Sequence, residues 1–132
     1  MAARTFEVVK PITEEHYAAI EGHVFAGGEQ GGCYGVDVYQ VVGKTNNYLK
    51  LRVIPQVSLQ ADHAYGNYVN GIDWQWIDDH PFDPKKDGKE LERFTLQVSN
   101  DGQYGMAKGT GTTAVWLSEC QRDDTFSSCT YD

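Results

Sequence analysis

Long apolar runs, signal-peptide features and an excess of positive charge are all missing from this 132-residue sequence. No apolar stretch approaches the length that a membrane-spanning helix needs, and the N-terminus lacks the charged-then-apolar order of a signal peptide. The net charge of −8 repels phosphate backbones and anionic headgroups. We therefore expect a cytoplasmic protein with no nucleic-acid partner and no membrane partner.

Cysteine is scarce, with only Cys33, Cys120 and Cys129. An odd number of cysteines without a secretory signal favours reduced thiols, although Cys120 and Cys129 are close enough in sequence to form one bridge. No C-x-x-C motif and no Cys/His spacing typical of a metal site occurs. The sequence thus predicts isolated structural thiols and no bound metal.

Catalytic signatures are absent as well, including nucleophile motifs, phosphate-binding loops and dinucleotide fingerprints. One group of carboxylates and imidazoles could do acid/base work or bind a divalent cation: Asp62-His63, Asp78-Asp79-His80 and Asp83. Nothing in its spacing brings these side chains together, so a solvated acidic loop explains the group better. We expect no enzymatic activity and no cofactor.

The strongest positive signal is a strand-forming run from Val38 to Val53, interrupted by the polar break Gly43–Asn47. After the break, Leu49, Leu51 and Val53 share one face, and Tyr48, Lys50 and Arg52 share the other. This alternation predicts an antiparallel hairpin with one buried face and one wet face. Val41 and Val42 run up to the glycine, so we expect apolar side chains at the hairpin tip.

The flanking segments predict a strand, a helix and further strands. Thr5–Val9 predicts a strand ended by Lys10-Pro11, and Thr13 predicts the N-cap of a helix from about Glu14 to Phe25. Further strands are predicted at Glu90–Val98, Gln103–Lys108 and Thr112–Cys120, with a turn at Asn100-Asp101-Gly102, and the tail from Arg122 is expected to be partly mobile. Residues 56–89 predict a folded, aromatic-rich excursion with a short strand at Gly71–Ile77.

The hairpin resembles the first inhibitory hairpin of the cystatin superfamily, where Q-x-V-x-G is followed by T-N-Y and a strand ending in K-V-R-V. The matching residues are Gln40, Val41, Val42, Thr45, Asn46, Tyr48, Lys50, Arg52 and Val53. Gly43-Lys44 stands where that family has Ala-Gly. Upstream, Lys10–Glu15 resembles the K-P-A-T-x-E entry to the helix of stefins, and Cys33-Tyr34-Gly35 is similar to their T-Y-G.

The resemblance implies a single α+β domain over residues 1–132, with a cystatin-like antiparallel sheet wrapped around one N-terminal helix and an inserted loop region at about 56–89. It also implies a monomer that reversibly and non-covalently inhibits papain-like cysteine proteases by occluding the cleft. The protease-binding residues would then be Gln40, Val41, Val42, Gly43 and Lys44 in the first loop, Val98, Ser99, Asn100, Asp101 and Gly102 in the second, and Arg4 and Thr5 in the N-terminal trunk.

Departures from the family pattern leave other interpretations open. The trunk lacks the usual glycine, and the second loop lacks the family's Leu-Pro or Pro-Trp. Trp116 is an aromatic candidate for that loop's role, although a tryptophan of the core or of the sheet face explains it better. The hairpin tip is equally interpretable as a plain surface turn.

A second functional class is also consistent with the sequence. The glycine- and tyrosine-rich, strand-forming composition and the acidic surface favour a non-enzymatic structural or assembly protein, such as a capsid-surface or filament component. Such a protein could join a homo-assembly by adding its edge strands to a neighbouring sheet. Size-exclusion behaviour would separate a monomeric inhibitor from an assembling protein.

Overall fold

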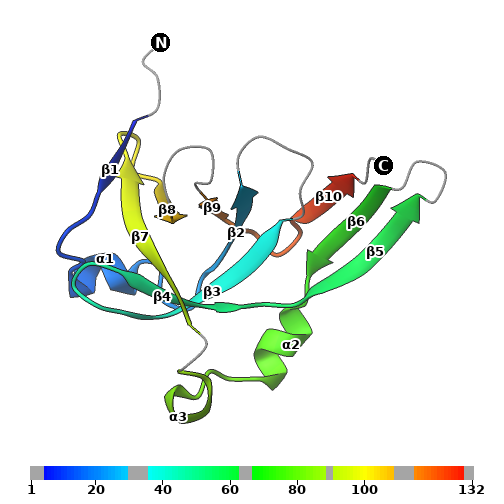
Figure 1. The fold of residues 1–132 in the computed structure, drawn as a ribbon, viewed down its shortest axis with the longest axis horizontal. Coiled ribbons are helices and arrows are strands. Elements are labelled where there is room, and N and C mark those ends of the chain that lie inside the picture. The colour runs from blue at the N-terminus through cyan, green and yellow to red at the C-terminus, as the bar shows by residue number, and fades with distance from the viewer. Residues whose placement is uncertain (1–4, 30–35, 63–66, 89–90, 109–114, 130–132) are drawn as a thin grey trace.

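The computed structural model describes residues 5–29, 36–62, 67–88, 91–108 and 115–129, which are mostly β with only short helices (Figure 1). The elements are, in chain order, β1 (Phe6–Val8), α1 (Glu14–Ala18), β2 (Val24–Glu29), β3 (Asp37–Lys44), β4 (Leu49–Val53), β5 (Gln56–Asp62), β6 (Asn67–Ile72), α2 (Trp74–Asp79), α3 (Pro84–Asp87), β7 (Glu92–Ser99), β8 (Tyr104–Lys108), β9 (Val115–Glu119) and β10 (Thr125–Cys129).

Six strands close into an antiparallel barrel in the order β7-β4-β3-β2-β9-β8, with β8 pairing back onto β7. Two meanders, β2-β3-β4 and β7-β8-β9, supply the six strands, and β1 adds a short strand beside the end of β7. Large apolar side chains fill the barrel. The buried residues of this core are Val9, Ile12, Ile20, Phe25, Val41, Leu49, Leu51, Phe94, Leu96, Met106 and Leu117.

The prediction of a cystatin-like sheet wrapped around an N-terminal helix is wrong. Thr13 does cap a helix, since its Oγ1 accepts a hydrogen bond from the His16 N–H at 3.2 Å. However, α1 ends at Ala18, not Phe25, and none of its residues is buried. The chain reverses at Gly22, whose φ is +79°, a conformation that glycine adopts without strain. The β-forming residues Val24 and Phe25 then begin β2.

The hairpin prediction is confirmed in its pairing and only partly in its faces. β3 and β4 pair antiparallel, with a bulge between Val41 and Gly43. Leu49 and Leu51 are fully buried as expected, but Val53 is 55% exposed and Arg52 only 7% exposed. The face expected to be wet is therefore covered at Arg52, because the excursion after β4 folds back over it.

The inserted region is a built substructure rather than a loop. Its first half forms β5 and β6, which pair antiparallel. Of the strand predicted at Gly71–Ile77, only Gly71 and Ile72 belong to a strand, which is β6. From Asp73 onward the prediction is wrong, because Asp73 caps α2 by accepting a hydrogen bond from the Trp76 N–H at 2.9 Å. The tail expected to be mobile instead forms β10, which pairs with β6. Part of that predicted tail, residues 130–132, lies outside the described residues.

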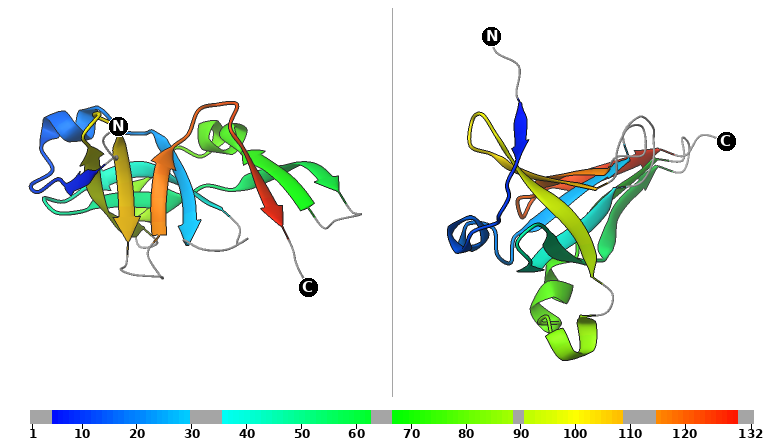
Figure 2. Two further views of the ribbon diagram at one scale, coloured as in Figure 1. Left: turned by 90° about the horizontal axis from the view of Figure 1, so that it is seen from above. Right: turned by 60° about the vertical axis from the view of Figure 1, so that its left-hand side comes forward.

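We name the three-stranded sheet β10-β6-β5 the wing. It projects to one side of the barrel in two views at right angles to each other (Figures 1 and 2). A second core joins it to the outer face of β2 and β3, where residues alternate with those of the barrel core. The buried members of this second core are Val24, Ala26, Val38, Ile54 and Ile72, and Val36, Trp74, Trp76, Ile77 and Cys120 pack partly buried against them.

Candidate functional site

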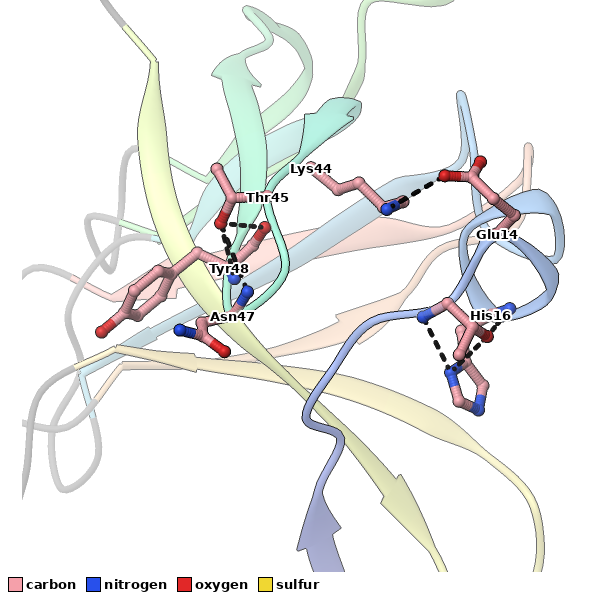
Figure 3. Close-up of polar contacts among 7 residues, drawn as sticks. Glu14, His16, Lys44, Thr45, Asn47 and Tyr48 are labelled. Atoms are coloured by element: carbon pink, nitrogen blue, oxygen red, sulfur yellow. Dashed lines mark hydrogen bonds and ion pairs between the residues drawn. The ribbon is translucent and has the colours of Figure 1, made fainter.

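The hairpin tip is a tight polar turn. The Thr45 N–H donates to the Tyr48 carbonyl at 2.8 Å, and the Thr45 hydroxyl accepts from the Tyr48 N–H at 3.1 Å (Figure 3). Lys44 forms an ion pair with Glu14 at 3.1 Å, as Figure 3 also shows. The Asn46 carbonyl accepts from the Ile12 N–H at 2.8 Å, which ties the tip to the segment before α1. The tip therefore presents polar atoms and a lysine that is already paired.

The two valines expected at the tip differ in exposure. Val41 is 1% exposed and belongs to the barrel core, where it pairs with Leu51. Val42 is half-buried and lines a shallow pocket of about 280 Å³ together with Gln40 and residues of the excursion. Gln40 itself donates to the Gly22 carbonyl at 3.0 Å. The expectation of apolar anchors held beyond the interior is thus contradicted at Val41.

The second predicted loop is brought together with Thr5. The Asn100 N–H donates to the Thr5 carbonyl at 3.0 Å, and Ser99 is buried and accepts from the Gln103 N–H at 2.9 Å. Val98 and Gly102 flank this turn, in which the Ser99 hydroxyl also donates to Asp101 and the Gly102 N–H donates to the Ser99 carbonyl. Arg4 lies outside the described residues.

The first and second loops do not form one continuous surface. Along one side of β7, β4 pairs with Glu92–Phe94, and β1 pairs with Gln97–Ser99. The short strand β1 consequently lies between the hairpin and the second loop. A cleft-blocking wedge made of both loops is not assembled in this fold.

Trp116 lies on the outer face of the barrel. Successive residues of β9 point to opposite faces, and the neighbouring Leu117 is fully buried in the barrel core, so Trp116 points outward. Its ring covers Gly105, where an added Cβ would lie 2.4 Å from the indole, and contacts Phe6 edge-on at 4.5 Å between centroids. The tryptophan therefore fills a gap between β1, β8 and β9.

A polar cluster that the sequence gave no sign of joins the excursion to the barrel. The Arg52 Nε donates to Gln40 Oε1 at 2.8 Å, and one terminal nitrogen donates to the His80 carbonyl at 2.6 Å. The guanidinium lies 5.0 Å from the centre of the Trp76 ring, which stacks on His80. Burial lowers the pKa of Arg52, and Asp87 acts in the opposite direction. We call Gln40, Arg52, Trp76 and His80 the Arg52 cluster.

A pocket of about 550 Å³ opens beside the Arg52 cluster, lined also by Asp79, Asp83, Lys86 and Asp87. The aspartates within it are engaged in local structure, since Asp83 caps α3 and Asp87 accepts from the Asp83 N–H at 3.1 Å. Trp76 contacts Arg52 and His80, so its aromatic surface is largely used within the protein. The contacts of Trp76 and His80 with Arg52 hold α2 against β4.

The acidic and imidazole residues singled out in the sequence do not form a metal centre in the part of the chain that the structure describes. Asp78, Asp79 and His80 belong to α2 or its C-cap, and Asp83 precedes α3. Asp62 ends β5, while its neighbour His63 lies outside the described residues.

The outer strands of the wing are the most unusual surface of the protein. Within the described residues, β5 pairs only with β6, and β10 also pairs only with β6. The three strands contain seven, six and five residues, and Asp62 is the one charged residue among these 18, whereas 23% of the whole chain is charged. Val57 and Leu59 on β5 are 37% and 57% exposed. An uncharged sheet with open edges is a template for strand pairing.

Cys120 has an inert thiol. Burial, with smaller contributions from Asp124 and Glu119, raises the pKa of the Cys120 thiol from 9.0 to about 11. At pH 8 its thiolate fraction is therefore roughly a hundredfold below that of an unshifted thiol. In a Cys33→Ser/Cys129→Ser variant we expect iodoacetamide to alkylate Cys120 about a hundredfold more slowly in buffer than in urea. Equal alkylation rates in buffer and in urea would show that the Cys120 thiol is not buried.

The same shift affects stability at alkaline pH. Because the pKa is raised in the folded state, the contribution of the neutral thiol is present below pH 9.0 and is lost as the pH rises towards about 11.

Comparisons with protein-family models, with curated proteins and with solved structures give no match to this chain. Among the described residues, no helix is both long and apolar enough to cross a bilayer.

Proposed function

We propose that this protein is a non-enzymatic assembly protein that associates with further copies of itself through the wing. The observation that carries the proposal is an almost uncharged sheet whose two outer strands pair with no further strand among the described residues. Exposed backbone N–H and C=O groups on such an edge can pair with another strand, and Val57 and Leu59 add apolar surface beside them.

A comparison within the molecule supports this assignment. The other outer strand, β1, has three residues, contains Glu7 and is followed by Lys10-Pro11, so it carries the charge, shortness and proline that discourage strand addition. β5 is seven residues long and has neither lysine nor proline. Pro55 precedes β5 and Asp62 ends it, so the difference between the two edges lies in length and in the absence of charge from Gln56 to Ala61.

The charge distribution favours a second copy over a basic partner. The chain carries a net charge of −8, and a basic protein would be expected to bind where the acidic residues are. The three strands of the wing contain only one of the chain's 19 acidic residues, Asp62, so two wings can approach each other with little repulsion. Salt should strengthen association, because it screens the repulsion between the remaining acidic surfaces.

Inhibition of papain-like proteases stays an untested prediction, and the geometry on which it rested is absent. Val41 is in the barrel core and Lys44 is paired with Glu14. The tip therefore lacks the buried apolar anchors that supply most of the affinity in protein interfaces.

Light scattering over a range of concentrations tests self-association. Between about 1 μM and about 1 mM protein, we expect the weight-average mass to rise from the 14.8 kDa of one chain to at least twice that value, and to rise earlier at higher salt. A constant mass of one chain across that range would overturn the proposal. Inhibition of papain by the monomer at micromolar concentration would also contradict it and favour the inhibitor hypothesis.

A further inference from the structure

We propose, resting on self-association as the function, that two copies pair β5 against β5 across a two-fold axis. The two wings would then form one continuous six-stranded antiparallel sheet in the order β10-β6-β5-β5-β6-β10. The partner is a second copy of this chain, and the seam is made by main-chain hydrogen bonds between the two β5 strands.

Strand direction within the wing selects this arrangement. Both β5 and β10 run antiparallel to β6, so they run parallel to each other. Adding β10 of one copy to β5 of the next, with both wings facing the same way, would give a parallel pair, which is slightly less stable per residue. A two-fold axis normal to the sheet makes β5 pair antiparallel with itself and keeps the faces aligned. Two-fold pairs are also the commonest closed arrangement of identical subunits.

The exposed apolar side chains of β5 meet at such a seam. Val57 is the direct cross-strand partner of Gly71, so both residues point to the same face of the wing. Leu59 lies over Gly71 on that face, 3.1 Å from where a Cβ would be. Pairing β5 with itself would place Val57 and Leu59 of the two copies on one shared face. The pair would remove from water apolar surface that the monomer leaves exposed.

The charge on β5 is compatible with self-pairing. Asp62 is the last residue of the strand, so in an antiparallel pair it lies opposite the beginning of the other copy's β5. The two Asp62 residues would then be about 20 Å apart along the strands, given a rise of about 3.4 Å per residue. That separation exceeds the Debye length of about 10 Å at 0.1 M salt, so their repulsion is screened.

The seam is expected to be reversible. β5 has a bulge between Ser58 and Gln60, and bulges increase the local twist of an edge and shorten the regular stretch available for pairing. The bulge leaves the ends of β5 regular, so a short ladder forms on each side of it. The association should therefore depend on concentration rather than be permanent.

Lysine substitutions on β5 and on β1 show whether association depends on the β5 seam or on exposed apolar residues elsewhere. We expect Val57→Lys/Leu59→Lys to raise the dissociation constant measured by light scattering at least tenfold, because the four lysines of the two copies would gather on one face around the two-fold axis. The matched control is Val8→Lys, at a valine that is equally exposed but lies on β1. It should leave the dissociation constant unchanged. Circular dichroism spectra and melting temperatures identify any variant that fails to fold.

Disulfide trapping gives an independent readout. In a Cys33→Ser/Cys120→Ser/Cys129→Ser background, single cysteines at positions 57, 58, 59 and 60 are oxidised in turn. Opposed residues in an antiparallel pair have Cα atoms about 4.5 to 5.5 Å apart, within the range of a disulfide. We expect a covalent dimer at one or two of these positions and none for Glu7→Cys on β1.

The outcomes separate the two proposals. An assembly that persists in Val57→Lys/Leu59→Lys, with no covalent dimer from any β5 cysteine, would overturn the β5 seam and leave self-association standing. A parent protein that stays monomeric would overturn self-association itself.

Discussion

Val41→Asp is expected to unfold the protein or to lower its free energy of unfolding by about 4 kcal/mol or more. Val41 is 1% exposed and packs inside the barrel, so the aspartate would be a buried charge without a cationic partner. Lost packing of the valine side chain adds to that desolvation cost. Urea denaturation, followed by circular dichroism, measures the difference from the parent.

The control for this substitution is Val8→Asp. Val8 is a 51% exposed valine in β1, and the same change there should alter the free energy of unfolding by no more than about 0.5 kcal/mol. If Val41→Asp were as stable as Val8→Asp, Val41 would have to lie on the surface. That result would remove the barrel core described above and restore the hairpin tip as a candidate anchor for a protease cleft.

Arg52→Met is expected to lower the free energy of unfolding by about 2 to 4 kcal/mol. The substitution leaves Gln40 Oε1 and the His80 carbonyl without their donors and removes the cation from the Trp76 ring. Because the Arg52 cluster joins the excursion to the barrel, hydrogen exchange should speed up first in α2. Denaturant midpoints and hydrogen exchange by mass spectrometry measure the two effects.

Arg93→Met is the control for Arg52→Met, and Arg52→Lys tests whether the planar guanidinium of Arg52 is needed. Arg93→Met, at an exposed arginine on β7, should change stability by no more than about 0.5 kcal/mol. Arg52→Lys should lie between the parent and Arg52→Met, since an ammonium group keeps the charge but cannot reproduce the planar fork. Equal stabilities for Arg52→Met and Arg93→Met would show that the Arg52 cluster does not hold the excursion in place.

Local signals in the sequence predicted local structure well. The Thr13 cap, the pairing of β3 with β4, the strand β7 and the turn at Asn100-Asp101-Gly102 all depend on residues within a few positions of one another. Turn chemistry and capping act over that range, so one sequence is enough to find them.

Closure of the barrel could not be predicted in the same way. It depends on the pairing of β2 with β9, which joins Phe25 to Glu119, residues far apart in the chain. Val24 and Phe25, which begin β2, also fit the helical spacing that predicts a helix as far as Phe25. Long-range pairing then overrode the local helical spacing.

The exposure expected for Val41 at the hairpin tip was wrong for a related reason. Successive residues of a strand point to opposite faces, so one position decides whether a valine fills a core or faces a partner. The pattern of Gln40, Val41 and Val42 fixes which residues alternate, but it does not fix which face is inside. The burial of Arg52 could not be predicted either, because Trp76 and His80 contact it from a segment without a strong pattern of apolar residues.

The second core has a kinetic consequence for the wing. Val24, Ala26 and Val38 of the barrel pack with Ile54 and Ile72 at the base of β5 and β6, so the wing is held at a fixed angle before any encounter. Two wings that meet have no segment to fold first, and their association rate constant should lie on the order of 10⁵ to 10⁷ M⁻¹ s⁻¹, the range of rigid bodies that must only find the correct orientation. Differences in affinity among variants of β5 will then arise mainly from how long each pair lasts.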